Sequence, residues 1–401
     1  MIVADGSRAP RRLARTGAFA VATAALTAIF VSSGMPIPLY NLYRLDDGIT
    51  NSALAVTTVG YLCATAVALL AFGRLSNHLG RRPVAVVSIV LAIAGVIVLS
   101  QVHSLPILLL GRVLQGFACG IASSTLGAYV VDTAPAKPRA IGALVTASAP
   151  PFGISMGAIL SGFLVESGPA PRTLAFHLIA GVLIVLALLL ALCPETMQRT
   201  PGALRSLRPR IQTPRGSRRI LIGAAAAFIA TWAIAGFYQA FAPSMTADYL
   251  DTNNGLTVAL VFSSVVILNP VGGIVAGWVG SRWSLRVGLI AFALAFCVVV
   301  AAMTVGDIRI FLLASLIASI GMGAASTSAI DILMDGAEPL ERAGLLATVY
   351  LISYGGAATT GLFSTATVDT LGLSTLATIF AALCTFLSIV AIAALRVTKP
   401  G

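Results

Sequence analysis

The sequence predicts an all-α membrane protein with twelve transmembrane helices, arranged as two pseudo-repeated six-helix bundles. Of the 401 residues, 58% are apolar and only 10% are charged, and the mean hydropathy is +0.97. A soluble domain carries about 25% charged residues and could not bury this much apolar surface. The apolar residues also come in long runs separated by short basic segments. Finally, a sequence pattern in the first half of the chain recurs in the second half.

The apolar runs are long enough to cross a lipid bilayer, which takes roughly 20 mostly apolar residues. The expected spans cover residues 17–39, 53–73, 83–100, 106–131, 139–164, 173–193, 220–243, 256–280, 286–304, 309–333, 342–366 and 371–395. Arg8, Arg11, Arg12 and Arg15 precede the first run, as basic residues do in signal peptides. Because so many further spans follow, an uncleaved first helix is the favoured interpretation.

The longest polar interruption divides the chain into two halves. Residues 194–219 are rich in Arg and Pro, and we expect them to form a cytoplasmic linker. The other expected segments are a first tail, an N-terminal bundle, a C-terminal bundle and a second tail, at 1–16, 17–193, 220–395 and 396–401. Lys and Arg concentrate in the tails, the linker and alternate loops, so the positive-inside rule places both termini in the cytoplasm. We therefore expect a multi-pass protein of the cell (inner) membrane.

The recurring pattern places an acidic and a basic residue at the cytoplasmic ends of corresponding spans. Asp132 and Arg139 precede the segment AIGAL, and Asp335 and Arg342 precede the segment AGLLA at the same displacement along the chain. Parallel six-span repeats joined by a central linker are a transporter architecture, with the substrate site between the repeats.

The loop after the second span carries the residues by which the chain resembles a known family. This loop reads GRLSNHLGRR, and the major facilitator superfamily has the motif G-x-L-a-D-R/K-x-G-R/K-R/K at this place. The matching residues are Gly73, Leu75, Gly80, Arg81 and Arg82. Where the family usually has Asp, this chain has Asn77, which can accept a hydrogen bond but supplies no charge.

The resemblance implies that this loop belongs to a cytoplasmic latch. In the family, loop arginines pair with acids at neighbouring helix ends and hold the two halves in the outward-open state, and Asp132 is the matching acid for Arg81. The expected members of the latch are Gly73, Asn77, Gly80, Arg81, Arg82, Asp132, Arg139, Asp335 and Arg342. The alternative is an ordinary basic turn whose arginines only determine topology.

The fourth span contains an arginine in a second motif of the same family. Arg112, Gln115 and Gly116 match the motif R-x-x-Q-G. An arginine at the centre of a span costs about 2.5–3.5 kcal/mol to insert, so we expect Arg112 to face the protein interior. The resemblance implies a role in proton coupling or substrate binding for these residues. The alternative is an interfacial arginine that extends outward to water.

The fifth span is rich in proline and glycine. Pro150 and Pro151 are expected to kink the helix, and Gly153 and Gly157 to let a neighbouring helix pack closely. This segment loosely resembles the Gly/Pro-rich motif of the drug/proton antiporters within the family. The resemblance favours export over import, although plain helix packing would use the same residues.

By the same resemblance, the first, fourth, seventh and tenth spans line the substrate cavity. Polar and aromatic residues expected there are Thr27, Tyr40, Cys119, Trp232, Tyr238, Gln239 and Ser319. Helix packing is the alternative role for each of these side chains. The first, fourth and seventh spans have no acidic residue at their centres, so Asp331, near the cytoplasmic end of the tenth span, is the candidate acid for coupling.

These features predict a secondary active transporter that moves a small organic molecule by alternating access, with proton-coupled export favoured. An importer or facilitator, and a non-transporting sensor on the same fold, are the alternatives. The chain lacks the central carboxylate pair, His cluster or Ser/His pair that an enzyme would need. Its Cys and His residues lack metal-ligand spacing, so we expect neither a metal nor a cofactor. We expect a monomer that contacts lipid and a small-molecule substrate, with protons as a further candidate and no nucleic acid.

Overall fold

The computed structural model describes residues 15–135, 141–207, 218–335 and 339–396, and every regular element within these ranges is helical. The elements are α1 (Arg15–Gly34), the 3-10 helix η1 (Ile37–Leu39), α2 (Tyr40–Asp47), α3 (Asn51–Phe72), α4 (Ser76–Leu79), α5 (Arg81–Leu99), α6 (Leu105–Thr133), α7 (Ile141–Ser167), α8 (Leu174–Ala191), α9 (Ala203–Ser206), α10 (Arg218–Tyr249), α11 (Gly255–Ser264), α12 (Asn269–Val279), α13 (Ser281–Val305), α14 (Ile308–Met334), α15 (Pro339–Leu371) and α16 (Leu373–Arg396). Residues 1–14, 208–217 and 397–401, which belong to the expected tails and linker, lie outside the described residues.

Eleven helical segments of the described chain are long and apolar enough to cross a membrane. Helix α15, with 33 residues, occupies the one remaining position among the twelve expected spans. The fold is therefore that of an all-α membrane protein, as the composition predicts.

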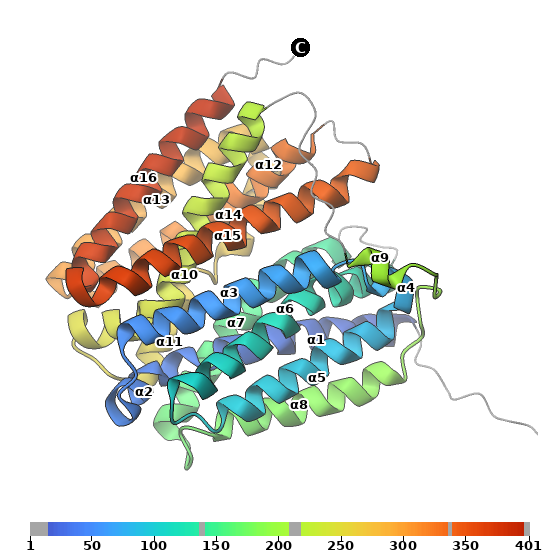
Figure 1. The fold of residues 1–401 in the computed structure, drawn as a ribbon. Helices are drawn as coiled ribbons and strands as arrows, with labels where there is room; N and C mark the ends of the chain where they lie inside the picture. The colour runs from blue at the N-terminus through green and yellow to red at the C-terminus, as the bar shows by residue number, and fades with distance from the viewer. Residues whose placement is uncertain (1–14, 136–140, 208–217, 336–338, 397–401) are drawn as a thin grey trace, which may run out of the picture.

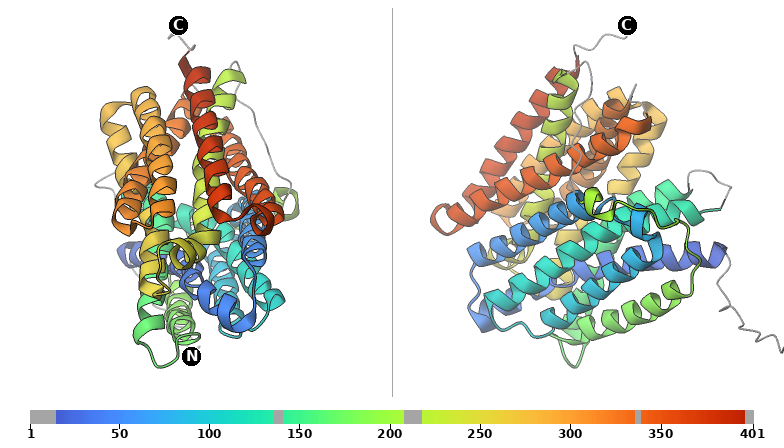
Figure 2. Two further views of the ribbon diagram at one scale, coloured as in Figure 1. Left: turned by 90° about the vertical axis from the view of Figure 1, so that its left-hand side faces the viewer. Right: turned by 45° about the vertical axis from the view of Figure 1, so that its right-hand side comes forward.

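The helices form two groups. Helices α1 to α8 pack with one another, as do α10 to α16, and the groups meet along α3 and α15 and along α7 and α11 (Figure 1). Two further directions show the same pair of groups (Figure 2). The short helices α4 and α9 contact each other at one end of the first group. We call this end of the molecule the linker side and the opposite end the outer side.

Three helices that begin on the outer side have conventional N-terminal caps. The Thr50 hydroxyl accepts a hydrogen bond from the backbone N–H of Ala53, and Asn254 and Asp307 cap α11 and α14 in the same way. Each cap satisfies an N–H group that has no acceptor within its own helix. These short polar side chains therefore define where the helices start at that end.

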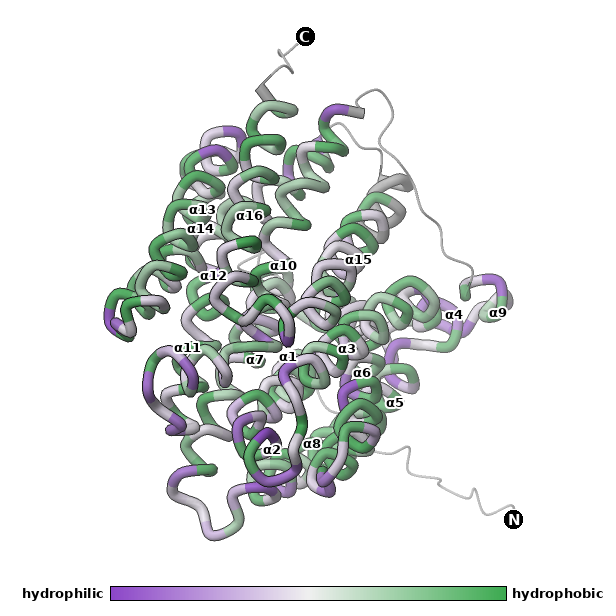
Figure 3. The backbone as a smooth tube through the Cα atoms, turned by 60° about the vertical axis from the view of Figure 1, so that its left-hand side comes forward, coloured by the Kyte–Doolittle hydropathy of each residue, from purple (hydrophilic) through white to green (hydrophobic). Residues whose placement is uncertain are grey.

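The surface around the middle of the molecule is apolar, as a lipid-facing surface must be. Large apolar side chains such as Leu188, Leu294 and Phe386 are more than 60% exposed. Hydrophobic segments recur along the long helices, most clearly along α13 and α14 (Figure 3). A protein in water would not leave so much apolar surface exposed, whereas lipid is its natural solvent.

The eighth span departs from its predicted form. The sequence predicts one helix over residues 256–280, but the span is divided into α11 and α12, with a turn between Ser264 and Asn269. Pro270 lies in the first turn of α12 and has no N–H to continue the hydrogen-bond ladder. The Ser319 hydroxyl accepts a hydrogen bond from the freed N–H of Leu268 at 3.1 Å. A side chain from a neighbouring span thus compensates for the interruption, which the sequence of this span alone does not show.

Candidate functional site

Arg112 lies about two turns from the start of α6 and is fully buried, with 0% of its surface exposed. Its Nη1 atom donates hydrogen bonds to the backbone oxygen of Ser33, at 2.8 Å, and to Oε1 of Gln115, at 2.9 Å. The guanidinium lies over the ring of Tyr61, with its carbon 4.4 Å from the ring centroid. This arginine therefore does not extend outward to water, which was the alternative to a buried position.

Gln115 extends the same contact between α6 and α1. Its Nε2 atom donates to the backbone oxygen of Ser32 at 2.6 Å. Ser32 and Ser33 lie in the last turn of α1, where carbonyl groups lack partners within the helix and carry partial negative charge. The cation and the amide of α6 thus neutralise the end of α1. Gly116, the third motif residue, lets α3 approach, because a Cβ atom there would lie 2.5 Å from the backbone oxygen of Tyr61.

Two guanidinium nitrogens of Arg112 remain available. Within the described part of the chain, Nε and Nη2 are buried and have no hydrogen-bond partner. Buried donors are nearly always paired, and an unpaired charged donor is expensive. These atoms therefore have the capacity to bind a further acceptor, such as a carboxylate or carbonyl oxygen of a bound molecule.

Aromatic side chains connect this arginine to the second half. Tyr61 and Cys119 interact with each other beside Arg112 in the first half, and Tyr354 of α15 lies near both of them. Trp232 of α10 packs edge-on against Tyr354, with 4.4 Å between ring centroids. We call these five residues the central cluster. It crosses the interface between the two groups of helices, where a transporter of this architecture binds its substrate.

Sequence reasoning finds three members of the central cluster and misses two. Arg112, Cys119 and Trp232 are expected at the site, whereas Tyr61 and Tyr354 lie on the second and eleventh spans, which are not among the expected cavity spans. No sequence signal distinguishes them, because aromatic and hydroxyl-bearing residues recur in both spans.

The remaining expected cavity residues lie elsewhere. The Tyr238 hydroxyl is hydrogen-bonded to the Ser315 hydroxyl inside the second half. The Thr27 hydroxyl donates to the backbone oxygen of Thr23 on its own helix. Gln239 is buried on α10, Tyr40 is buried in α2 towards the outer side, and Ser319 supports the break between α11 and α12.

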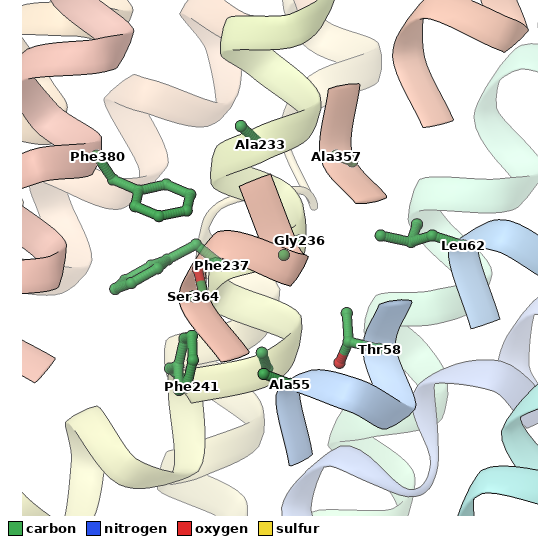
Figure 4. Close-up of a pocket in the computed structure, with 12 residues that line it drawn as sticks. Ala55, Thr58, Leu62, Ala233, Gly236, Phe237, Phe241, Ala357, Ser364 and Phe380 are labelled. Carbon is green, nitrogen blue, oxygen red and sulfur yellow. The ribbon is translucent and has the colours of Figure 1, made fainter. Parts of the chain in front are cut away.

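A small cavity lies beside the central cluster at the same interface. Thr58 and Leu62 of α3 face Phe237 and Phe241 of α10 across it, with Phe380 behind (Figure 4). Its volume is about 10 Å³, which is room for one water molecule. The halves are therefore packed closely here, and a drug-sized molecule would need them to separate.

The fifth span places its glycines against a neighbouring helix. Pro150 and Pro151 lie inside α7, which remains helical through both. A Cβ atom on Gly157 would lie 1.9 Å from the backbone oxygen of Val31, and one on Gly153 would also press against α1. The glycines thus allow α7 to lie directly against α1, the helix whose end receives Arg112.

The loop motif forms a compact polar cluster on the linker side. Arg81 Nε lies 3.2 Å from Asp132 Oδ2, and Arg81 Nη1 donates to Ser76 and, at 2.6 Å, to Oδ1 of Asn77. The departure from the family motif at Asn77 therefore retains an acceptor for Arg81 without its charge. Gly80 has φ = 98°, a conformation that glycine adopts readily. At the start of the loop, a Cβ atom on Gly73 would lie 2.3 Å from the backbone oxygen of Leu69.

Glu195 is a member of this cluster that sequence reasoning does not place there. Its carboxylate accepts hydrogen bonds from the backbone N–H groups of Arg81, at 2.7 Å, and Arg82, at 3.1 Å. It thereby occupies the N-terminus of α5, where unpaired N–H groups and the helix dipole favour an anion. The side chain of Arg82 donates to carbonyl groups of Ala191 and Cys193 at the end of α8.

The positions of the other expected latch residues are only partly described. Arg139 and the side chain of Arg342 lie outside the described residues, and Asp335 is exposed where α14 ends. Asp331 accepts a hydrogen bond from the Ser281 hydroxyl at the start of α13, at 3.0 Å. Arg81, Arg82 and Glu195 form the contacts described above within the first half and its adjoining linker. The ends of α5, α6 and α8, which these contacts join, all belong to that half.

On the outer side, polar contacts do connect the two halves. Arg44 forms an ion pair with Asp248 at 3.2 Å, and Asn41 Nδ2 donates to the backbone oxygen of Pro243 at 3.1 Å. Further contacts join Ser244 to Asn51 and Glu166 to the N–H of Gly255. A polar hollow of about 420 Å³ adjoins the Arg44–Asp248 pair. The outer ends of the two groups are thus held together.

A second ion-pair group on the outer side stays within the first half. Arg172, in the loop between α7 and α8, contacts Asp47 at 2.7 Å and Asp46 at 3.2 Å. The hydrogen bond to Asp47 raises the pKa of the Arg172 guanidinium further above its ordinary value, so this residue stays charged at any physiological pH.

Comparison with known sequences identifies the family. The profile of the Major Facilitator Superfamily matches residues 18–279, which is more than half of the chain. The chain belongs to the Major Facilitator Superfamily. This superfamily consists of multi-pass membrane transporters, which are not enzymes.

The curated relatives of this superfamily member include drug-resistance proteins. Quinolone resistance protein NorA of Staphylococcus aureus is 22% identical over 187 residues, which are 46% of this chain and 47% of NorA. Multidrug resistance protein MdtL of Klebsiella pneumoniae is 33% identical over 110 residues, which are 27% of this chain and 28% of MdtL. The matched region thus spans about half the length of NorA and less of MdtL.

A solved structure shares the fold of the superfamily over nearly the whole chain. A point mutant of the nucleoside transporter NupG superposes with a TM-score of 0.72, covering 94% of this chain and 100% of that one. At 13% identity, this likeness establishes the fold alone.

Proposed function

We propose that this transporter exports a small amphipathic organic molecule, neutral or anionic and carrying an aromatic ring, by alternating access. The observation that carries the proposal is the central cluster, in which a buried cation with two free donors lies over Tyr61 and aromatic rings of the second half follow next to Tyr61. Aromatic side chains give a ring-bearing substrate apolar and stacking contacts. The drug-resistance relatives and the Gly/Pro-rich fifth span support export.

The charge preference follows from the distribution of acids. Each described Asp or Glu lies in a loop or in a terminal turn of a helix, so the described part of the membrane interior holds no carboxylate to balance Arg112. A cationic substrate there would meet an uncompensated positive charge, whereas a carboxylate would be attracted to it and form charge-assisted hydrogen bonds. We therefore propose that anions and neutral molecules are accepted and dications are not.

The decisive experiment is an accumulation panel in cells that lack their main exporters. Neutral, anionic and dicationic aromatic compounds should be compared in cells expressing the wild type, and Arg112→Ala should serve as the transport-deficient control. We expect reduced accumulation of the first two classes only. Selective efflux of dications, or concentrative uptake of a nutrient, would contradict the proposal and favour the importer alternative.

We propose that protons drive the export. The support is the resemblance of the fifth span to drug/proton antiporters. The described acids add none, because they lie at helix ends rather than near Arg112. Flux in proteoliposomes with and without an imposed pH gradient tests this separately from substrate class. Equal flux in both conditions would exclude proton coupling and leave a facilitator.

We further propose a monomer in the cell membrane with the linker side in the cytoplasm. The concentration of arginine in the linker supports this orientation. In a cysteine-free background, Leu204→Cys and Leu45→Cys provide matched probes on the two sides, because these side chains are 83% and 72% exposed. An impermeant thiol reagent should label residue 45 and spare residue 204 in intact cells. The reverse pattern would invert the topology.

A further inference from the structure

The two halves start corresponding helices with the same backbone turn but complete it differently. Helix α5 follows Gly80, with φ = 98° and ψ = 151°, and α13 follows Gly280, with φ = 94° and ψ = 138°. The first half also has the four-residue helix α4 before this turn, whereas Gly280 directly follows α12. By this correspondence, Ser281 and Arg282 occupy the positions of Arg81 and Arg82.

In the first half, the chain itself supplies an anion to this turn. The Glu195 carboxylate binds the N–H groups of Arg81 and Arg82, so close to the turn that a Cβ atom on Gly80 would lie 2.7 Å from its Oε2. At Gly280, no atom of the described chain lies within 4 Å of the same position, and no described side chain accepts a hydrogen bond from the N–H groups of Ser281 or Arg282. Glu195 follows the last helix of its half, whereas residues 373–401 include no acid.

Asp331 does not replace the missing carboxylate. It binds the Ser281 hydroxyl from the end of α14, in the way that Asp132 binds the Arg81 side chain from the end of α6. The counterpart of the Asp132 contact is therefore present in the second half, while the counterpart of the Glu195 contact is missing. The N–H groups at the start of α13 remain without an acceptor among the described residues.

The side chains around this turn combine positive charge with exposed aromatic rings. Arg282 and Arg286 lie one turn apart on α13, and neither forms a hydrogen bond or ion pair with any residue that the structure describes. Trp278 is 82% exposed and Trp283 is 60% exposed on either side of the turn. Tryptophan is enriched where a membrane protein meets the headgroup region of the bilayer. The span formed by α11 and α12 begins on the outer side, so the turn that follows α12 lies on the linker side.

We propose that the turn between α12 and α13 binds the headgroup phosphate of an acidic phospholipid, which takes the position held by Glu195 in the first half. The phosphate accepts hydrogen bonds from the start of α13 and from Arg282 and Arg286, while Trp278 and Trp283 pack against the adjoining glycerol and acyl chains. A soluble anion would make no apolar contact with the exposed rings of Trp278 and Trp283, so a lipid fits the site better than free phosphate.

The two tryptophans provide a direct readout, because the chain has only three. Trp232→Phe leaves fluorescence from Trp278 and Trp283 alone. This variant should be placed in two kinds of phosphatidylcholine bilayer. One contains brominated phosphatidylglycerol, and the other contains the same fraction of brominated phosphatidylcholine. Bromine on the acyl chains quenches nearby tryptophan. We expect the site to prefer brominated phosphatidylglycerol by roughly thirty-fold, as two basic residues near an anionic surface would give.

The charge dependence is tested by Arg282→Gln/Arg286→Gln in the same background. We expect the preference to fall to about one-fold, whereas Arg309→Gln, an exposed arginine on the outer side, should retain it. Arg282→Gln alone, which is a smaller perturbation, should give an intermediate value. Equal quenching by the two lipids in the parent, or an unchanged preference in the double variant, would overturn the proposal. A fluorescence response to inorganic phosphate in detergent would assign the site to a soluble anion instead.

Discussion

At the scale of single residues, Arg112 is held by contacts that depend on the shape of a guanidinium. Its Nη1 atom binds two oxygens while the planar group lies over Tyr61. We predict that Arg112→Ala and Arg112→Lys both lower export at least about tenfold, which corresponds to 1.4 kcal/mol. Lysine would keep the charge but lose the planar stacking and the fork of donors. Transport rates per molecule of membrane-inserted protein would measure the effect.

The amount of inserted protein separates a functional role of Arg112 from a structural one. Removing a buried cation lowers the cost of insertion, so expression of Arg112→Ala should not fall. Normal export in Arg112→Ala would show that the cation only joins α6 to α1, whereas normal export in Arg112→Lys would show that positive charge alone is sufficient.

Glu195 offers a second prediction at this scale. Its carboxylate accepts hydrogen bonds from four backbone N–H groups, of Arg81, Arg82, Thr196 and Met197. Glu195→Ala should lower the free energy of unfolding by about 1–2 kcal/mol, the range for a lost helix cap or charged hydrogen bond. Thermal unfolding in detergent would measure this, with Arg199→Ala in the same linker as the control. Equal melting temperatures of the two variants would exclude a capping role.

At the scale of helices, the contact between α7 and α1 depends on the absence of side chains. We predict that Gly157→Ala destabilises the protein by about 1–3 kcal/mol, because the new Cβ atom would meet the backbone oxygen of Val31 at 1.9 Å and the helices must move apart. Gly181→Ala on α8 is the matched control, because it is exposed and no described atom lies within 4 Å of its Cβ position. This control should be neutral or stabilised by up to about 1 kcal/mol. Similar melting temperatures for both variants would show that the α1–α7 contact adapts easily.

Much of this element-level structure follows from sequence, because lipid imposes a simple rule. A long apolar run must become a helix in a membrane, so most of the predicted span ends lie within a few residues of the observed ones. The break between Ser264 and Asn269 is not predicted, because its compensation comes from Ser319 on another helix. Such support depends on which helices are neighbours, which hydropathy does not encode.

The same limit applies to the central cluster. Arg112 can be identified because a charge inside a span is conspicuous and lies in a motif. Tyr61 and Tyr354 are separated by almost three quarters of the chain, and neither is unusual within its own span. Only the packing of α3 against α15 brings them to the same place.

At the scale of the whole molecule, the outer contacts predict which conformation prevails. The Arg44–Asp248 pair is partly exposed and contributes about 0.2–1 kcal/mol, while the buried bond from Asn41 to Pro243 contributes about 1 kcal/mol. Both link the first half to the second and stabilise outer closure. Opening the outer side must break them, so they set part of the free-energy difference between the two states.

We predict that Asp248→Asn combined with Asn41→Ala shifts the population towards an open outer side by roughly ten-fold or more, which about 1.4 kcal/mol would produce. Spin labels at Leu45 and Asn253, exposed residues of opposite halves at the outer hollow, should then show a longer distance. Asp46→Asn is the matched control, because Asp46 contacts Arg172 within its own half and should leave the distance unchanged. An unaltered distance in the double variant would mean that apolar packing of α7 against α11 closes the outer side. A change in the Asp46→Asn control would mean that closure responds to total outer charge, since no link between the halves is removed there.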